Sequence, residues 1–368
     1  MLIEFTVKNY RSIKDEQVFS LAKAKGDELQ KTNSFIPTAP ASVPLLRSAV
    51  IYGANAAGKS NIINAMMAMK SIIRHSASDG QAGDKMPIKP FLFDEISSDS
   101  PTEFEMVFIY QGVRYQYGFS VTKYHVIEEW LFAFPKGRPQ NWFSRINNPE
   151  TGQSSYKFGD SLSGQKTVWK NATRTNALFL STAVQLNSEQ LQPVFNWFYD
   201  TLKLSSVFGW EPGYTASLCD EPSDKKSILN FLQAADIDIH DIHMKKEKFD
   251  PKTLPNDIPI QLKEKMASQL KDEIIVDIKT IHKTTNDKLV PLDIEEESDG
   301  TQALFAFAGP VIDVLKNGYI LIIDELHNHF HPKLVQYLVG LFHNEKTNPH
   351  NAQLIFTTHE TSILNQDV

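Results

Sequence analysis

"AVIYGANAAGKSN", residues 49–61, decides the fold of this chain. A short apolar strand runs directly into a loop of small residues, and the loop satisfies the pattern G-x-x-x-x-G-K-[ST] at every fixed position. Small residues let successive backbone N–H groups turn toward a phosphate, and the positive end of a following helix favours the same anion. Helical spacing of apolar residues after Lys59 supplies that helix. The stretch therefore predicts a loop that binds a nucleoside triphosphate.

Each part of the loop has an expected role. Lys59 is expected to neutralise the β- and γ-phosphates, and Ser60 to hold Mg²⁺. The residues expected to bind the nucleotide in this loop are Gly53, Ala54, Asn55, Ala56, Ala57, Gly58, Lys59, Ser60 and Asn61. A loop of this kind by itself also fits a kinase, a GTPase or a motor, so residues elsewhere in the chain must narrow the class.

The composition of the 368 residues is that of a soluble globular protein, with 41% hydrophobic and 22% charged residues. The net charge of −7 gives no support to nucleic-acid binding, although a local basic patch stays open. One cysteine, Cys219, excludes an internal disulfide framework and suits a reducing cytosol. No apolar run approaches the roughly 20 residues of a membrane helix, and the N-terminus is typical of a strand rather than a signal peptide. We expect a cytoplasmic protein without a membrane partner.

The chain divides by pattern into three expected parts. Residues 1–165 are expected to form a first lobe with the phosphate loop and an antiparallel β-subdomain. Residues 166–285 are expected to form an inserted, mostly helical subdomain, and residues 286–368 a second lobe. The insert shows no heptad register sustained over three repeats, which argues against a long coiled-coil arm.

Secondary structure is most clearly predicted at two places. Strands at 104–110 and 113–121 flank a two-residue Gln111-Gly112 turn, and their aromatic stripe indicates a packed core more than a surface for stacking bases. The elements expected in the insert are helices at 188–202, 224–235 and 260–273 and a strand at 273–281.

A nucleotide hydrolase also needs acidic residues at the end of a second buried strand, for magnesium and for the attacking water. Three stretches compete: "FLFDE" (91–95), "EIIVD" (273–277) and "YILIIDE" (319–325). The first follows a proline, which disfavours a central strand, and the second has a single acid. The third has a fully apolar strand followed by two acids. We therefore expect Asp324 to hold Mg²⁺ and Glu325 to polarise the water.

Taken together, "VKNYRS", "GANAAGKSN", "SDGTQ", "LIIDE" and "TTHE" resemble the soluble cassette-type ATPases of the RecF, SMC and OLD kind. Within these, the chain most resembles the prokaryotic AAA-family ATPases of phage-defence and abortive-infection operons (Rlo-type). "LIEFTVKNYRSIKDEQVFSL", "ESDGTQ" and "DELHNHFHPKLV" carry that resemblance, while residues 150–285 resemble the group only loosely. The implied fold class is α/β: a P-loop NTPase of the ABC-ATPase type, with a split nucleotide-binding domain that has a mixed sheet, an antiparallel β lobe and helices, and with an inserted α+β subdomain.

The resemblance implies that two domains sandwich ATP head to tail, so that each site is shared between subunits. Ser298, Gly300 and Gln302 then match the signature motif that grips the γ-phosphate of the neighbouring subunit's nucleotide. The same residues have an ordinary alternative role, because Ser298 can cap the helix that begins there. The motif departs from the common L-S-G-G-Q form, with Glu297 for the leucine and Asp299 for the first glycine.

The resemblance also implies roles for residues at two other places in the chain. Residues 9–12 match a segment near the nucleotide, where Arg11 is the expected phosphate or base contact. His359, at the end of "QLIFTTHE" (353–360), matches a switch histidine that faces the γ-phosphate. The expected catalytic set is thus Lys59, Glu325 and His359, with ATP and Mg²⁺ as cofactors. The resemblance also implies a Q-loop glutamine, which the sequence does not place.

Two features near the C-terminus carry expectations of their own. In "LHNHFHP" (326–332) a metal site is an alternative to a D-loop, and the D-loop is favoured because Pro332 suits the first position of a helix and no partner ligands accompany the histidines. The chain ends nine residues after His359, before the closing strands that the resemblance implies. We expect that a C-terminal part is missing.

The function implied is Mg²⁺-dependent ATP hydrolysis by a homodimer or higher homo-oligomer. In the cell it would be the sensor or regulator of an anti-phage (abortive-infection) effector, a nuclease or toxin from a neighbouring gene. Two alternatives stay open. One is a RecF-like DNA-repair ATPase that acts as a DNA clamp, with nucleic acid as its partner, and the other is a nucleotide-dependent scaffold with little turnover.

Overall fold

Strand β5 (Ser48–Tyr52) and helix α2 (Lys59–His75) flank the phosphate loop, as the sequence predicts. The computed structural model describes residues 1–26, 29–148, 150–205, 210–248, 260, 265, 274–326 and 330–359. The chain forms two units, Met1–Ser206 with Val314–Val368, and Val207–Asp313. The helix expected at 260–273 lies outside the described residues except for Ile260 and Lys265.

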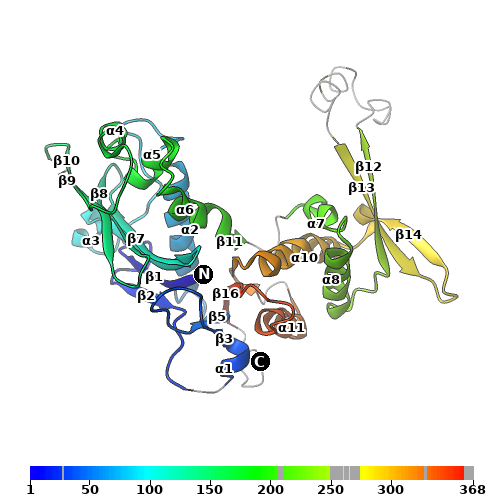
Figure 1. Cartoon of the computed structure of the whole chain (residues 1–368). Helices are drawn as coiled ribbons and strands as arrows, with labels where there is room; N and C mark the ends of the chain where they lie inside the picture. The colour runs from blue at the N-terminus through cyan, green and yellow to red at the C-terminus, as the bar shows by residue number, and fades with distance from the viewer. Residues whose placement is uncertain are drawn as a thin grey trace. The chain divides into compact units, whose positions relative to one another are not determined.

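The larger sheet of the first unit has seven strands, all antiparallel, in the order β10-β9-β8-β7-β6-β1-β2 (Figure 1). Its strands are β1 (Leu2–Lys8), β2 (Gln17–Ser20), β6 (Thr102–Tyr110), β7 (Val113–Val121), β8 (Val126–Phe134), β9 (Gln140–Asn148) and β10 (Gln153–Phe158). The predicted hairpin is confirmed: Gln111 and Gly112 both have positive φ, 50° and 75°, which a tight two-residue turn requires. Its aromatic stripe is core, since Phe108 is fully buried and stacks on Trp197 at 4.0 Å between ring centroids.

The second sheet of this unit is parallel, with the order β11-β15-β16-β5. Its other strands are β11 (Leu202–Ser205), β15 (Ile320–Ile323) and β16 (Gln353–Thr358). All four residues of β15 are buried, as expected for an apolar strand covered on both faces. "YILIIDE" therefore supplies a strand of the phosphate-loop sheet. "FLFDE" contains no strand and runs into α3 (Glu95–Asp99), and "EIIVD" belongs to the other unit.

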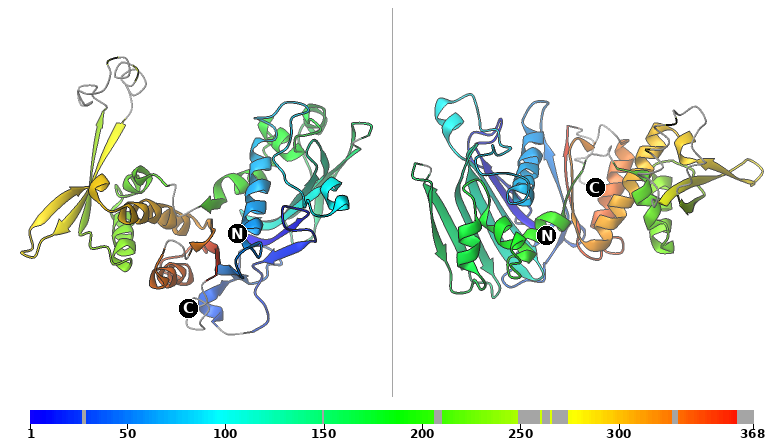
Figure 2. Two further views of the ribbon diagram at one scale, coloured as in Figure 1. Left: turned by 180° about the vertical axis from the view of Figure 1, so that it is seen from behind. Right: turned by 90° about the horizontal axis from the view of Figure 1, so that it is seen from above.

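Helix α2 lies between the two sheets (Figure 2). Its apolar side buries Ile63, Met66, Met69 and Ile72 in a core that also includes residues of β1, β6, β15 and β16. The methionines at 66 and 69 are thus core residues, whereas Met67 is about half exposed. Since α2 begins at the end of the loop, this packing fixes the loop against both sheets.

Shorter elements complete the first unit. They are α1 (Gln30–Asn33), β3 (Ser34–Phe35), β4 (Leu45–Leu46), α4 (Lys166–Ala172), α5 (Phe179–Gln185), α6 (Gln192–Asn196), the π-helix η1 (Trp197–Thr201) and α11 (Pro332–His343). Helices α4 to α6, which the sequence pattern assigned to an insert beginning at residue 166, belong to this unit. The three-part division itself stays a prediction.

The second unit combines a three-stranded antiparallel sheet with helices (Figure 1). Its elements are α7 (Pro212–Leu218), α8 (Pro222–Ala234), β12 (Asp241–Lys248), β13 (Ile274–Lys283), β14 (Leu289–Asp293), the 3₁₀ turn η3 (Ile294–Glu296) and most of α10 (Asp299–Asn317). The predicted helix at 224–235 and the strand at 273–281 are confirmed as α8 and β13. No helix in the described ranges is long and apolar enough to cross a bilayer.

Proline at position 310 lies inside α10, where it removes one hydrogen bond. The carbonyl deprived of its donor is that of Ala306, and the hydroxyl of Thr215 in α7 donates to it at 2.8 Å. The N–H of Gly309 donates to the same hydroxyl at 3.1 Å. A Cβ at position 309 would lie 2.7 Å from the Cα of Thr215, so glycine permits this close approach. Helix α10 therefore continues past its proline because α7 completes its hydrogen bonding.

Candidate functional site

The phosphate loop takes the conformation that its small residues predict. Ala56 and Gly58 have positive φ, 62° and 89°, and Gly58 is the N-cap of α2. A glycine cap offers no side chain to the first-turn N–H groups, and none is capped by a side chain among the described residues. A Cβ at Gly58 would lie 3.2 Å from the Oγ of Ser12. The helix thus begins with N–H groups available to an anion.

Lys59 folds back over this loop. Its Nζ donates to the carbonyl oxygens of Gly53 at 2.7 Å and Ala54 at 2.9 Å. The ammonium is therefore held against the backbone at the start of the loop. A phosphate oxygen can replace these neutral carbonyl acceptors with a stronger, charge-assisted hydrogen bond.

Asp324, at the end of β15, contacts the phosphate-loop helix through one carboxylate oxygen. Ser60 Oγ donates to Asp324 Oδ1 at 3.1 Å, and the buried hydroxyl of Thr357 donates to the same oxygen at 2.5 Å. The backbone N–H of Glu325 in turn donates to the Thr357 hydroxyl at 2.7 Å. Residues from α2, from the end of β15 and from β16 are thus joined by three hydrogen bonds. The structure brings the two predicted metal-ligating residues, Ser60 and Asp324, into direct contact.

Glu325 and His359 lie at the same edge of the parallel sheet. Glu325 is exposed and has a φ of 51°, an uncommon conformation for a residue with a side chain. His359 is also exposed and directly follows Thr358, which is paired with Tyr52, the residue before the phosphate loop. Because parallel strands end at one edge, the loop, the two acids and the histidine belong to one surface.

The segment at residues 9–12 contacts the phosphate-loop helix. The Nδ2 of Asn61 donates to Ser12 Oγ at 2.6 Å, and the hydroxyl of Tyr10 donates to the carbonyl of Asn64 at 3.2 Å. Arg11 is exposed, has a φ of 49°, and its guanidinium carbon lies 5.5 Å from the centre of the Tyr10 ring. This strained turn places Arg11 beside the nucleotide-binding loop.

The signature residues lie in the second unit. The hydroxyl of Ser298 accepts from the N–H of Thr301 at 3.2 Å, so Ser298 caps α10 as the alternative interpretation proposes. Ser298 and Gly300 are exposed, and Gln302 Nε2 donates to the carbonyl of Glu297 at 2.8 Å. Capping leaves the exposed first turn of α10 free to face a partner, so both interpretations remain compatible.

Glu297, the residue that replaces the usual leucine, is almost buried, with 10% of its side chain exposed. Its Oε1 accepts from Thr280 Oγ1 and contacts His282 Nε2, each at 2.6 Å. Both partners lie on β13. Glu297, in place of the usual leucine, thus connects the signature to β13 through polar contacts.

The sequence motifs assign no role to the hydroxyls of Thr357 and Ser12. Thr357 lies within "TTHE", where the motif gives a role only to the histidine, because a threonine in a strand ordinarily indicates β propensity. In the sequence, the signal for such a role is a hydroxyl residue at the end of a strand next to the acidic strand.

Of the histidines in "LHNHFHP", His327 and His329 lie outside the described residues. His331 accepts from the N–H of Lys333 at 3.3 Å and caps α11, which begins at Pro332.

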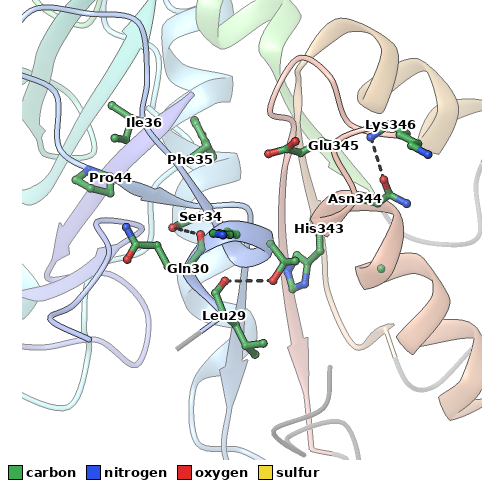
Figure 3. A pocket seen from close by; sticks show the side chains of 13 residues that line it. Leu29, Gln30, Ser34, Phe35, Ile36, Pro44, His343, Asn344, Glu345 and Lys346 are labelled. Carbon is green, nitrogen blue, oxygen red and sulfur yellow. Dashed lines mark hydrogen bonds between the residues drawn. The ribbon is translucent and has the colours of Figure 1, made fainter. Parts of the chain in front are cut away.

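A cavity of about 1350 Å³ lies at the opposite end of β5 from the phosphate loop (Figure 3). Its lining includes Phe35, Ile36, His343 and Glu345. The Nε2 of His343 contacts the hydroxyl of Ser48, the first residue of β5, at 2.8 Å. Burial, together with the nearby positive charge of Arg47, lowers the pKa of His343 to about 4. The cavity is therefore separate from the nucleotide-binding edge.

A parallel sheet whose strands end together at a phosphate loop, an Asp-Glu pair and a histidine, with an antiparallel lobe beside it, is the fold of a P-loop nucleoside triphosphatase of the ABC-ATPase type, as predicted. Residues 48–365 match the model of the protein family described as "AAA domain, putative AbiEii toxin, Type IV TA system". The chain belongs to this family.

Other comparisons are more distant. No curated protein matches the chain. Similar solved structures include the recombination mediator protein RecF with ATPrS, at 14% identity and a TM-score of 0.38 over 99% of this chain and 93% of that chain. The same mediator with ATP has 14% identity and a TM-score of 0.36 over 98% and 94%.

Proposed function

We propose that this chain binds ATP with Mg²⁺ and hydrolyses it at a site that a second copy of the chain completes. The observation that carries the proposal is the contact of Ser60 and Thr357 with one carboxylate oxygen of Asp324. It joins the phosphate loop to an acidic strand end 264 residues later in the chain. A purely structural loop has no need of such a connection, whereas nucleotide hydrolysis requires it.

The residues present fit a magnesium ion. A serine hydroxyl and an aspartate carboxylate in contact are the oxygen ligands that Mg²⁺ takes at phosphate sites. When bound, the ion would neutralise charge on the β- and γ-phosphates. Lys59 and the first-turn N–H groups of α2 would hold the same phosphates, and Arg11 would contact a phosphate or the base.

Glu325 is the proposed general base. Its exposed carboxylate follows Asp324 directly, and the hydrogen bond from its N–H to Thr357 fixes its backbone. It would accept a proton from the water that attacks the γ-phosphate, while His359 at the end of β16 would contact the γ-phosphate itself. The exposed Ser298 and Gly300 of a second copy would then close the site from the other side, where the helix N-terminus of α10 favours an anion.

In the cell we propose that this ATPase senses infection and regulates an anti-phage effector. The support is the family description, whose words are "putative AbiEii toxin, Type IV TA system". An ATP-driven association of two copies would give the effector two states to distinguish. Co-expression with the neighbouring genes tests this role: we expect a small toxic or nucleolytic partner to co-purify and phage plaque counts to fall. Salt-dependent DNA binding without such a partner would instead favour a DNA clamp.

Variants of two residues test the enzymatic proposal. Lys59→Ala should lose ATP binding, with Lys157→Ala, a change of an exposed lysine on β10, as the matched control.

Glu325→Gln should bind ATP normally, lower steady-state hydrolysis at least about 100-fold and accumulate as an ATP-bound dimer. Its control is Glu189→Gln, at an exposed glutamate. The measurements are nucleotide binding by calorimetry, phosphate release, and mass by light scattering. Hydrolysis by Glu325→Gln at the wild-type rate would exclude this base.

A further inference from the structure

An exposed apolar surface lies on the segment of residues 91–96, which hydrogen bonds through the turn at residues 9–12 link to the phosphate-loop helix. Leu92, Phe93 and Ile96 are 66%, 91% and 80% exposed. Three large apolar side chains this exposed and this close in sequence are unusual on a soluble surface and indicate a site of contact with a partner. The rings of Phe93 and Phe91 form a T-shaped pair, at 5.8 Å between ring centroids.

The segment is held firmly although its side chains are exposed. Buried Asn9 accepts from the N–H of Phe91 at 3.0 Å and donates to the carbonyls of Ser97 at 2.7 Å and Ser100 at 2.9 Å. Asp94 caps α3 by accepting from the N–H of Ser97 at 2.9 Å. A surface fixed before binding loses little entropy when it binds, which suits a docking site.

The same turn at residues 9–12 connects this surface to the nucleotide site. The N–H of Arg11 donates to the carbonyl of Lys89 at 2.8 Å, and Ser12 accepts from Asn61 in the phosphate-loop helix. The apolar residues and the phosphate loop are therefore anchored to one short turn. A partner that seats on Phe93 would lie at the edge of the nucleotide site.

Charge on the side of Arg11 and Lys89 identifies the partner, while the exposed acids Glu95 and Asp99 lie on α3. Arg11 and Lys89 are exposed, and neither forms an ion pair among the described residues. In the second unit, Glu295, Glu296 and Asp299 surround the signature serine; all three are exposed and form no ion pair within the described part of the chain. A carboxylate cluster next to a residue that approaches ATP would repel the phosphates unless cations of the facing subunit neutralise it.

We propose that the surface formed by Lys89, Leu92, Phe93 and Ile96 is the docking site for a second copy of this chain. The acidic run at residues 293–299 of that copy binds its basic side, and Phe93 provides the apolar contact. This inference rests on the proposed ATP-dependent association and names the surfaces that make it. It also accounts for Asp299, which stands in this signature where the common form has a glycine: its exposed carboxylate selects a partner with a basic border to its phosphate loop.

The test uses the full-length chain with Glu325→Gln, ATP and Mg²⁺, and measures the dimer dissociation constant by sedimentation. Phe93→Asp should weaken the dimer at least about 10-fold, because it places a charge in an apolar contact. Ile146→Asp is the matched control, since Ile146 is 56% exposed on β9 of the same unit. ATP binding by the monomer should be unchanged in both variants.

Charge exchange tests whether the acidic run at residues 293–299 binds the basic side of the docking surface. Lys89→Glu alone and the pair Glu295→Lys with Glu296→Lys alone should each weaken the dimer. Combining all three substitutions should restore at least part of the lost affinity, and the weakening by either change should shrink at high salt. Circular dichroism and thermal unfolding show that each variant is folded.

The outcomes separate the two proposals. If the Glu325→Gln protein stays monomeric with ATP, the proposed function fails. If it dimerises and both Phe93→Asp and Lys89→Glu dimerise with the parent affinity, the docking surface is wrong and its exposed apolar residues serve another partner. If Lys89→Glu weakens the dimer and the exchanged pair restores nothing, the acidic run is not the surface that binds there.

Discussion

At the scale of single residues, the site depends on a hydroxyl that no motif names. Thr357 has one hydroxyl and uses it twice, as acceptor from the N–H of Glu325 and as donor to Asp324. It thereby orients the carboxylate that faces Ser60 and fixes the backbone of the proposed base. Glu325 holds a positive φ of 51°, which costs on the order of 1 kcal/mol and is retained only where neighbours enforce it.

Replacing Thr357 with valine should therefore impair catalysis more than folding. The substitution keeps the shape of the side chain but removes one of the two hydroxyl donors to Asp324 Oδ1 and the Thr357 acceptor of the part-buried Glu325 N–H, at a cost of about 1–3 kcal/mol of stability. We expect ATP binding to persist and the turnover number to fall at least about 10-fold. Phosphate release and calorimetry measure the two effects.

Thr357→Ser is the control, because serine keeps the hydroxyl and should retain most of the activity. Equal activity of the valine variant and the wild type would show that Asp324 and Glu325 are oriented without this hydroxyl.

At the scale of elements, regular patterns were predictable and local exceptions were not. The hairpin at residues 102–121 follows from alternation around a two-residue turn, and α2 follows from helical spacing after the loop. The expected helix at 188–202 instead consists of α6 and a π-helical turn, η1, because packing Trp197 and Phe198 into the core takes precedence over regular hydrogen bonding.

Buried polar contacts between distant elements are the part that the sequence could not supply. Glu129 is an ordinary charged residue in a strand by sequence, yet it is fully buried. Its carboxylate accepts from the N–H groups of Phe179 at 2.6 Å and Leu180 at 2.9 Å, which caps α5, and from the hydroxyl of Tyr117 at 3.0 Å. Only the tertiary structure shows which helix such a carboxylate caps.

The long helix that follows the signature should depend on Thr215. Thr215→Val removes the donor to Ala306 and the acceptor for Gly309, so two buried backbone groups lose their partner. We expect a loss of about 1–3 kcal/mol in the free energy of unfolding and faster amide exchange in the middle of α10. Urea unfolding and hydrogen exchange measure these.

Thr215→Ser keeps the hydroxyl and is the control. If the valine variant exchanges its α10 amides at the wild-type rate, the helix tolerates its proline without help from α7.

At the scale of the whole molecule, one edge of the parallel sheet brings together motifs that lie far apart in the sequence. Parallel pairing of β15, β16 and β5 brings their carboxyl ends together, so Asp324 and His359 reach the loop although they follow it by more than 250 residues. The sequence could predict this edge because the strands are short and mostly apolar and are followed directly by the motif residues. No sequence motif marks the opposite edge of the sheet, where the structure places the half-buried His343.

The pH dependence of the free energy of unfolding should depend on His343, which lies at that opposite edge. The pKa of His343 in the folded chain is about 4, below its ordinary value near 6.5, because the ring is buried and lies near Arg47. Between pH 6.5 and 4 the unfolded chain takes up a proton on this histidine and the folded chain does not. The free energy of unfolding should therefore fall as pH falls through this window, by up to about 3 kcal/mol, and level off below pH 4 as far as this group is concerned.

The variant His343→Gln isolates this contribution from that of the carboxylates, which also titrate at low pH. Glutamine can still contact the hydroxyl of Ser48 but cannot be protonated in this range. The difference between wild-type and variant stability, measured by urea unfolding from pH 7.5 to 4, should change by the amount given above, with wild type losing more as the solution becomes acidic. Parallel curves for the two proteins would mean that His343 is as easily protonated in the folded chain as in the unfolded one, and that the contact with Ser48 at the start of β5 opens without cost.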